Sequence, residues 1–232
     1  MDLTKLEKII GHQFKNKDLL KESLTHRSYL NENPSWGANF MSPHNERLEF
    51  LGDAVLELSV SEYLFQKYPD YNEGQLTSIR AALVNYQMLA KAAGDIELDK
   101  FILLSRGEAK DKGKAREVIL ANAFEAVLGA VYLDAGYLAA KSFIEKVVIV
   151  NLPEVLEKEL YRDPKSLLQE IIQEKLKFTP SYQVLSEHGP DHQKIFRVGV
   201  FFDGDLAAEG EGASKQEAEV EAAKNALNSI SN

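Results

Sequence analysis

The segment NERLEFLGD, residues 45–53, combines acidic and apolar side chains at the spacing of an α-helix. At about 100° per residue, Glu46, Glu49 and Asp53 share one face of that helix. The opposite face is apolar and consists of Leu48, Leu51, Val55 and Leu58. By periodicity alone, an ordinary amphipathic helix with a solvated acidic stripe explains this pattern better than a functional site.

A second informative helix surrounds Glu125, the only charged residue between Val118 and Leu133. A helix that is apolar nearly all round is expected to be central and buried. A carboxylate in such a helix is costly unless it pairs with a cation or binds a metal, and both explanations stay open. Asn122 lies one turn before Glu125. Gly129 lies one turn after it and allows another backbone to approach.

Together the two helices offer oxygen ligands from Glu49, Asp53, Asn122 and Glu125. These hard donors suit Mg²⁺, with Mn²⁺ as a substitute. Such a site can activate water and stabilise a phosphate during in-line displacement. The sequence has no cysteine, which excludes disulfides, thiolate zinc sites and a cysteine nucleophile. No comparable serine or histidine cluster and no small-molecule cofactor site is indicated.

The periodicity predicts an all-helical first part and a small α+β second part. Helices are expected at residues 3–10, 17–30, 45–68, 74–93, 116–134 and 137–150. After a boundary near residues 161–164, a helix runs to about Lys177. Strands follow at residues 182–185 and 195–202, with Asp203-Gly204 as a hairpin turn into a third. Ser214, with Glu217 three residues later, forms a capping box that begins a final helix.

Several polar residues of this second part are of the kind that suits recognition of duplex RNA, which proteins read by shape and by contacts across the minor groove. Gln169 and Gln173 lie on the polar face of its first helix, and His192 lies in a compact loop. Ser214 and Lys215 lie at a helix N-terminus, where N–H groups attract phosphate. Taken one at a time, these residues are more easily explained as surface residues, loop filler and a helix cap.

The net charge of -9 argues against a partner made of phosphates, so any nucleic-acid contact must rest on local patches. The N-terminus opens an amphipathic pattern and not a secretory signal. We see no apolar run of the roughly 18–20 residues that a membrane span needs. We therefore expect a cytoplasmic protein with no membrane partner.

Two further features are ambiguous. His26 follows a predicted helix and could touch a substrate, although a hydrogen-bonded structural histidine is more common. Lys110, Lys112, Lys114 and Arg116 form a basic loop. This loop is either simply solvated or in contact with phosphates.

Residues 45–53 resemble the signature of the ribonuclease III family. Residues 24–29, LTHRSY, and 124–134, FEAVLGAVYLD, also resemble that family, in the same order. The C-terminal third is similar to its double-stranded RNA-binding domain. The resemblance covers essentially the whole chain and is to the short bacterial form.

The resemblance implies a homodimeric, Mg²⁺-dependent endonuclease that processes ribosomal and other structured RNA precursors. Its staggered cuts in duplex RNA would leave 5′-phosphates, 3′-hydroxyls and short 3′ overhangs. Residues 1–158 would form the catalytic and dimerisation domain, 159–163 a linker and 164–232 the RNA-binding domain. Glu49, Asp53 and Glu125 match the family's metal-binding acids, with Asp53 and Glu125 central to catalysis. Glu46 and Glu73 match acids with supporting roles near the cleavage site.

Two positions depart from the family pattern. The family has Asp where this chain has Asn122, and an amide can bind a metal but brings no charge and cannot act as a base. A duplex-RNA-binding protein that does not cut is therefore the alternative function, and a purely structural cation site is a third. The family also has two adjacent basic residues after the serine, whereas here Gln216 follows Lys215. Because acids outnumber bases in the last third, we expect weak, salt-sensitive RNA binding by this domain alone.

Overall fold

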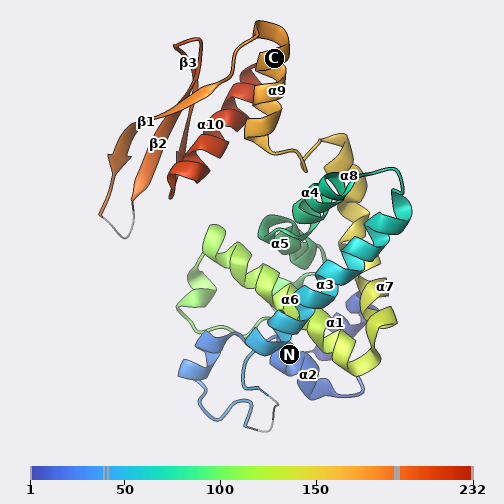
Figure 1. Cartoon of the computed structure of the whole chain (residues 1–232). Helices are drawn as coiled ribbons and strands as arrows, with labels where there is room; N and C mark the ends of the chain where they lie inside the picture. Colours follow the sequence, from blue (N-terminus) through green and yellow to red (C-terminus); the bar gives the residue numbers. More distant parts are fainter. Residues whose placement is uncertain (1, 39, 41, 191–193, 231–232) are drawn as a thin grey trace. The chain divides into compact units, whose positions relative to one another are not determined.

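The computed structural model describes residues 2–38, 40, 42–190 and 194–230, and the chain forms two compact units, Met1–Tyr161 and Arg162–Asn232. The division falls inside the segment expected to be a linker. Each unit has its own hydrophobic core. The predicted fold class, an all-helical unit followed by a small α+β unit, is confirmed (Figure 1).

The first unit consists of helices joined by short loops. The α-helices are α1 (Leu3–Ile10), α2 (Lys17–Ser23), α3 (Glu46–Lys67), α4 (Glu73–Val84), α5 (Tyr86–Asp95), α6 (Lys114–Ala135), α7 (Tyr137–Val147) and α8 (Leu152–Glu157). Short 3₁₀ helices are η1 (Arg27–Asn31), η2 (Leu98–Lys100), η3 (Glu108–Lys110) and η4 (Ile149–Asn151).

Two predicted helices are each interrupted. The helix expected at residues 17–30 ends at Ser23, because the backbone at Thr25 pairs with Leu103 in an isolated parallel bridge. The helix expected at residues 74–93 is α4 and α5, separated at Asn85. The Asn85 side chain accepts a hydrogen bond from the N–H of Met88 at 2.9 Å and so caps α5. Backbone pairing with a distant residue and local capping thus end these helices, although the apolar residues continue at helical spacing.

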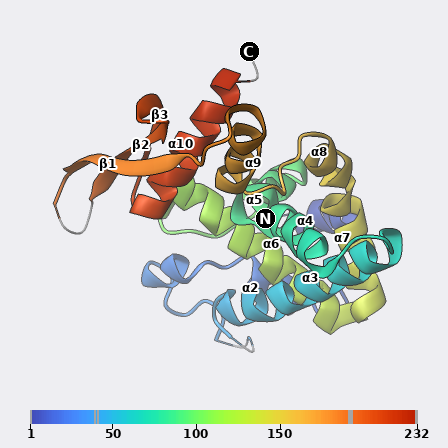
Figure 2. The same cartoon turned by 45° about the horizontal axis from the view of Figure 1, so that its top comes forward.

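Helix α6 is the centre of the first unit, packed against α2, α3, α5 and α7 (Figure 2). Its interior includes Phe124, Val127 and Leu128, which are fully buried. By length and composition α6 could cross a membrane, which corrects the expectation that no segment reaches that length. Because 50% of its most apolar window is buried inside the unit, α6 is the helix of a protein core.

The second unit is a three-stranded antiparallel sheet with two helices. The elements are α9 (Pro164–Leu176), β1 (Ser181–His188), β2 (Ile195–Phe202), β3 (Asp205–Gly212) and α10 (Lys215–Ile230), and the strand order is β1-β2-β3. Helix α10 packs on β2, β3 and α9, and the core includes Leu168, Ile172 and Val200.

The predicted Asp203-Gly204 hairpin is confirmed. Phe202 pairs with Asp205, and both turn residues have positive φ, 49° at Asp203 and 92° at Gly204. A two-residue turn with this geometry matches the right-handed twist of the strands that it joins. The turn therefore sets the pairing of Phe202 and Phe201, and an irregularity between Phe201 and Val200 shifts the register by one residue before Val200 enters the core.

Candidate active site and RNA-binding surface

Helices α3 and α6 make the most extensive contact in the first unit, and glycine sets their distance. A Cβ on Gly52 would lie 1.8 Å from the carbonyl oxygen of Glu125, and a Cβ on Gly129 would lie 2.3 Å from that of Leu48. No side chain fits at these distances, so the two backbones touch. This contact brings the acidic face of α3 beside Asn122 and Glu125 of α6.

Burial and crowding of negative charge perturb the acids at this crossing. Partial burial, with the charges of Asp53, Glu49 and Glu57, raises the pKa of Glu125 to about 8. Burial and the neighbouring charge of Glu46 also raise the pKa of Glu49, which a hydrogen bond from Asn122 partly offsets. Carboxylates this close together repel one another, and a divalent cation among them relieves the repulsion.

The donor set at the crossing fits a hard divalent cation. Glu49, Asn122 and Glu125 are partly buried, and Asp53 is exposed, so the group opens to solvent. Among the described residues, no three His, Asp or Glu side chains are already arranged as a closed set of ligands. The side-chain oxygens therefore approach one another around an ion only by rotamer changes on a fixed backbone.

The structure places the two supporting acids differently. Glu46 is the first residue of α3, and its carboxylate lies 3.5 Å from Nη1 of Arg27 and 3.8 Å from Nδ1 of His44. It is close enough to Glu49 to raise the pKa of that group. Glu73 is exposed at the start of α4 and lines a cavity between α3 and α4. Only Glu46 thus joins the carboxylates at the crossing within one chain.

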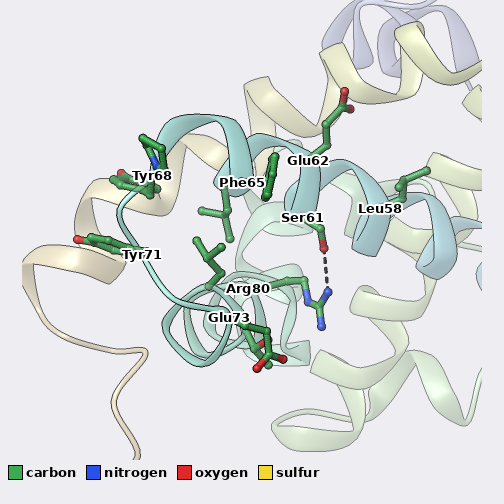
Figure 3. A pocket seen from close by; sticks show the side chains of 12 residues that line it. Leu58, Ser61, Glu62, Phe65, Tyr68, Tyr71, Glu73 and Arg80 are labelled. Carbon is green, nitrogen blue, oxygen red and sulfur yellow. Dashed lines mark hydrogen bonds between the residues drawn. The ribbon is translucent and has the colours of Figure 1, made fainter.

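That cavity has a volume of about 750 Å³ and is mainly apolar (Figure 3). Leu58, Phe65 and Leu76 line it, together with Arg80. Leu58, which the helical pattern put on the core side, is 59% exposed there. Helical periodicity placed Leu58 on the apolar face and did not predict its exposure. In the structure only a narrow strip of α3 is buried, which includes Leu48, Val55 and Leu56.

Sequence reasoning also missed Glu57, which the structure adds to the acids near Glu125. Its carboxylate forms an ion pair with Nε of Arg80 at 2.7 Å. The signal was present, since Glu57 follows Asp53 by four residues and therefore lies on the same helical stripe.

The structure gives the contacts of the two ambiguous features, His26 and the basic loop. His26 Nδ1 lies 2.8 Å from Oγ of Ser28, and burial lowers the pKa of this histidine, as expected for a structural residue. In the basic loop, Lys114 begins α6, and its ammonium lies 5.9 Å from the centre of the Tyr86 ring.

The candidate RNA-binding residues that the structure describes in the second unit are exposed. Gln169 and Gln173 lie on the solvent side of α9, opposite the buried Leu168 and Ile172. They share one face of a helix that Asp163 caps by accepting from the N–H of Ser166 at 2.9 Å.

The N-terminus of α10 is capped as predicted, with one difference. Oγ of Ser214 accepts from the N–H of Glu217 at 3.1 Å. Glu217 accepts from the N–H of Ala213, one residue earlier than in a standard capping box. The Lys215 ammonium lies 5.8 Å from the centre of the Phe196 ring. His192 lies outside the described residues.

Comparison with known proteins matches both units. Residues 16–152 match the Ribonuclease-III-like family model, and residues 164–230 match the double-stranded RNA binding motif. Ribonuclease 3 of Carboxydothermus hydrogenoformans is 49% identical over 232 residues, covering 100% of this chain and 97% of that protein. Ribonuclease 3 of Streptococcus gordonii is 46% identical over 229 residues, covering 97% of each.

The solved structures agree. The nuclease domain of ribonuclease III from Campylobacter jejuni is 43% identical, with a TM-score of 0.58 over 66% of this chain and 99% of that one. The resemblance found in the sequence is thus confirmed over both units. The chain belongs to the ribonuclease III family, and it is an endoribonuclease with a double-stranded RNA-binding domain.

Proposed function

We propose that the chain cleaves double-stranded RNA by divalent-metal-assisted hydrolysis of phosphodiester bonds, with Glu49, Asp53, Asn122 and Glu125 as the metal ligands. The observation that carries this proposal is the glycine contact between α3 and α6, which gathers several acids, and there burial together with the neighbouring charges raises the pKa of Glu125 to about 8. A fold keeps such a costly cluster where a cation can offset it.

The donor chemistry favours Mg²⁺, with Mn²⁺ as a substitute, because the candidate ligands are carboxylate and amide oxygens. When bound, the ion would supply activation of water and stabilisation of charge on the phosphate. Asp53 and Glu125 would hold it from opposite helices. Asn122 would offer an amide oxygen, or it would keep donating to Glu49 and so orient that carboxylate. Glu46 and Glu73 would act near the cleavage site without being primary ligands.

Residues 164–232 would hold the duplex through exposed side chains, and residues 159–163 would act as a linker from the catalytic domain at residues 1–158. Gln169 and Gln173 would contact a minor groove, as would His192 in its loop. Ser214 and Lys215 would meet phosphates at the N-terminus of α10. We place this activity in the cytoplasm, on ribosomal and other structured RNA precursors.

We infer that the active form is a homodimer built on α3. Phe50 is 81% exposed and Phe65 is 73% exposed in the single chain. Two large aromatic side chains of one helix are seldom left this exposed unless a partner covers them. The cavity lined by Phe65, Leu58 and Leu76 offers a receptor for an aromatic side chain. In a two-fold dimer, Phe50 of each protomer would enter the cavity of the other. Two active sites in a dimer would make the staggered cuts that leave 3′ overhangs.

Cleavage of a long perfect RNA duplex tests the function. We expect cutting with Mg²⁺ and with Mn²⁺, no cutting with chelator, and products that carry 5′-phosphates and 3′-hydroxyls. A Glu125→Gln chain should bind the duplex without cutting it. If the unaltered chain binds duplex RNA but cuts only after Asn122→Asp, the alternative is correct: a duplex-RNA-binding protein with a disabled metal site.

The dimer is tested separately by molar mass from light scattering. We expect the mass of two chains for the unaltered protein and of one chain for Phe50→Ser. Leu185→Ser removes an apolar side chain that is 41% exposed in the other unit, and this control should leave the mass unchanged. A dimer that persists in Phe50→Ser would contradict the arrangement on α3.

A further inference from the structure

A row of polar side chains extends along α3 beyond the proposed metal ligands. Glu49, Asp53, Glu57 and Ser61 follow one another at four-residue spacing, so they form one stripe along the helix. Glu57 lies one turn past Asp53, and its charge contributes to the raised pKa of Glu125. By position and by field, Glu57 belongs to the same group of acids.

Arg80 ends this row. From α4 its guanidinium contacts two successive turns of α3: Nε lies 2.7 Å from Oε2 of Glu57, and Nη1 donates to Oγ of Ser61 at 2.8 Å. Figure 3 shows the contact with Ser61. Two contacts on one rigid, planar group fix its position and keep its charge beside Glu57.

Stability alone does not account for this arrangement. The Glu57 side chain is 38% exposed and that of Arg80 is 36% exposed, and ion pairs with this exposure contribute little to folding. The field of a charge acts over a longer range than the contact itself. An unpaired carboxylate one turn from Asp53 would attract a divalent cation, whereas an unpaired guanidinium there would repel it.

We propose that the Glu57–Arg80 pair sets the charge around the metal site, so that the proposed ligands Glu49, Asp53, Asn122 and Glu125 determine how strongly a divalent cation is held. Both are positioning residues, and neither touches the ion. A site that holds its ion at moderate strength exchanges it readily, and Glu57 does not compete as an extra ligand. This inference rests on the proposed metal site.

The test is the affinity of the full-length protein for Mn²⁺ alone, measured by the electron paramagnetic resonance signal of the free ion. We expect Glu57→Gln to weaken binding and Arg80→Met to strengthen it, each by about threefold to tenfold. The double variant should return to within about twofold of the unaltered protein, because both charges are then removed together. Single variants that change the affinity in the same direction would overturn the inference.

Controls separate charge from structure. Glu154→Gln removes a carboxylate from another ion pair, 2.7 Å from Lys91, and should leave Mn²⁺ affinity unchanged. If Arg80→Met does not fold, Arg80→Lys retains the charge without the fork, and near-normal affinity is expected. A tenfold loss with Arg80→Lys would show that the geometry of the fork matters and would overturn a role through charge.

The same titration distinguishes the two proposals. If the unaltered chain and Glu125→Gln bind Mn²⁺ equally, the proposed metal site itself is wrong. If Glu125→Gln loses the ion but the single variants of the pair do not diverge, the metal site stands and only the role of Glu57 and Arg80 is refuted.

Discussion

Polar side chains have opposite environments in two regions of the molecule. One region is the contact between α3 and α6, and the other is the exposed face of α9 and the start of α10. At the α3–α6 contact, burial and the charges of neighbouring acids raise the pKa values of Glu49 and Glu125. On α9 and α10, the candidate RNA-binding residues Gln169, Gln173 and Lys215 are exposed on a core that is complete without them.

This difference indicates where substitutions should have large effects on stability and activity. The acids lie where two backbones touch, so small changes there should affect folding together with the proposed metal binding and catalysis. The RNA-binding side chains depend only on a helix that presents them, so each can be removed with a small and nearly independent effect.

Gly129→Ala should have the largest effect. Its new Cβ would lie 2.3 Å from the carbonyl oxygen of Leu48, so α3 and α6 must separate. We expect a loss of about 1–3 kcal/mol or more in the free energy of unfolding, measured by urea denaturation, and loss of cleavage. Gly94→Ala in α5 is the matched control, since nothing lies within 4 Å of its Cβ. It should be neutral or stabilising by up to about 1 kcal/mol.

Glu125→Gln should separate activity from stability. We expect cleavage to fall by at least about a hundredfold, because a metal ligand is lost. Burial and neighbouring acids raise the pKa of Glu125 from 4.5 to about 8, so without metal the folded state binds more protons than the unfolded state between these values. The folded state is more stable while Glu125 is protonated. Its free energy of unfolding is therefore higher at low pH and falls as pH rises through this window.

Without metal, the unaltered chain should therefore melt at a lower temperature at pH 8 than at pH 5. This decrease in melting temperature should be larger than the decrease for Glu125→Gln. Thermal melts of both proteins in chelator at several pH values measure this difference. Identical pH profiles for the two proteins would mean that Glu125 is not held among repelling charges.

Asn122→Asp should strengthen metal binding and weaken the metal-free fold, because it adds a carboxylate to the crowded site. Mg²⁺ should bind about tenfold more tightly, and the metal-free protein should melt at a lower temperature. The rise in Tm on adding Mg²⁺ should consequently exceed that of the unaltered chain, with KCl at equal ionic strength as the control. A smaller Mg²⁺ shift than in the unaltered chain would show that Asn122 is the better ligand.

Lys215→Ala should have the smallest effect. It removes an exposed cation beside the Phe196 ring, so duplex binding should weaken for all sequences alike. The slope of log K against log salt should decrease in magnitude by about one. Lys224→Ala is the control on the same helix, where the ammonium lies 3.6 Å from Glu221, and it should change the slope less. Equal slopes for Lys215→Ala and the unaltered chain would exclude a phosphate contact.

Periodicity and local conformation in the sequence were enough to predict the fold class, the hairpin turn and the acids Glu49, Asp53 and Glu125, but not Glu57. Asp203-Gly204 needs only its own φ angles, and Glu49 and Asp53 share a face on any α-helix. The breaks at Ser23 and Asn85 depend on partners such as Leu103 or on capping, which an apolar period does not encode.

Only the tertiary structure decided how these residues act on one another. The backbone contact of Gly52 with Glu125, the raised pKa of Glu125 and the pairing of Glu57 with Arg80 all arise between residues of different helices. Electrostatic interactions depend on the distances and solvent exposure that packing creates, so a list of charged residues does not contain them. The sequence pointed to most of these acids, and the contact of α3 with α6 is what brings them together.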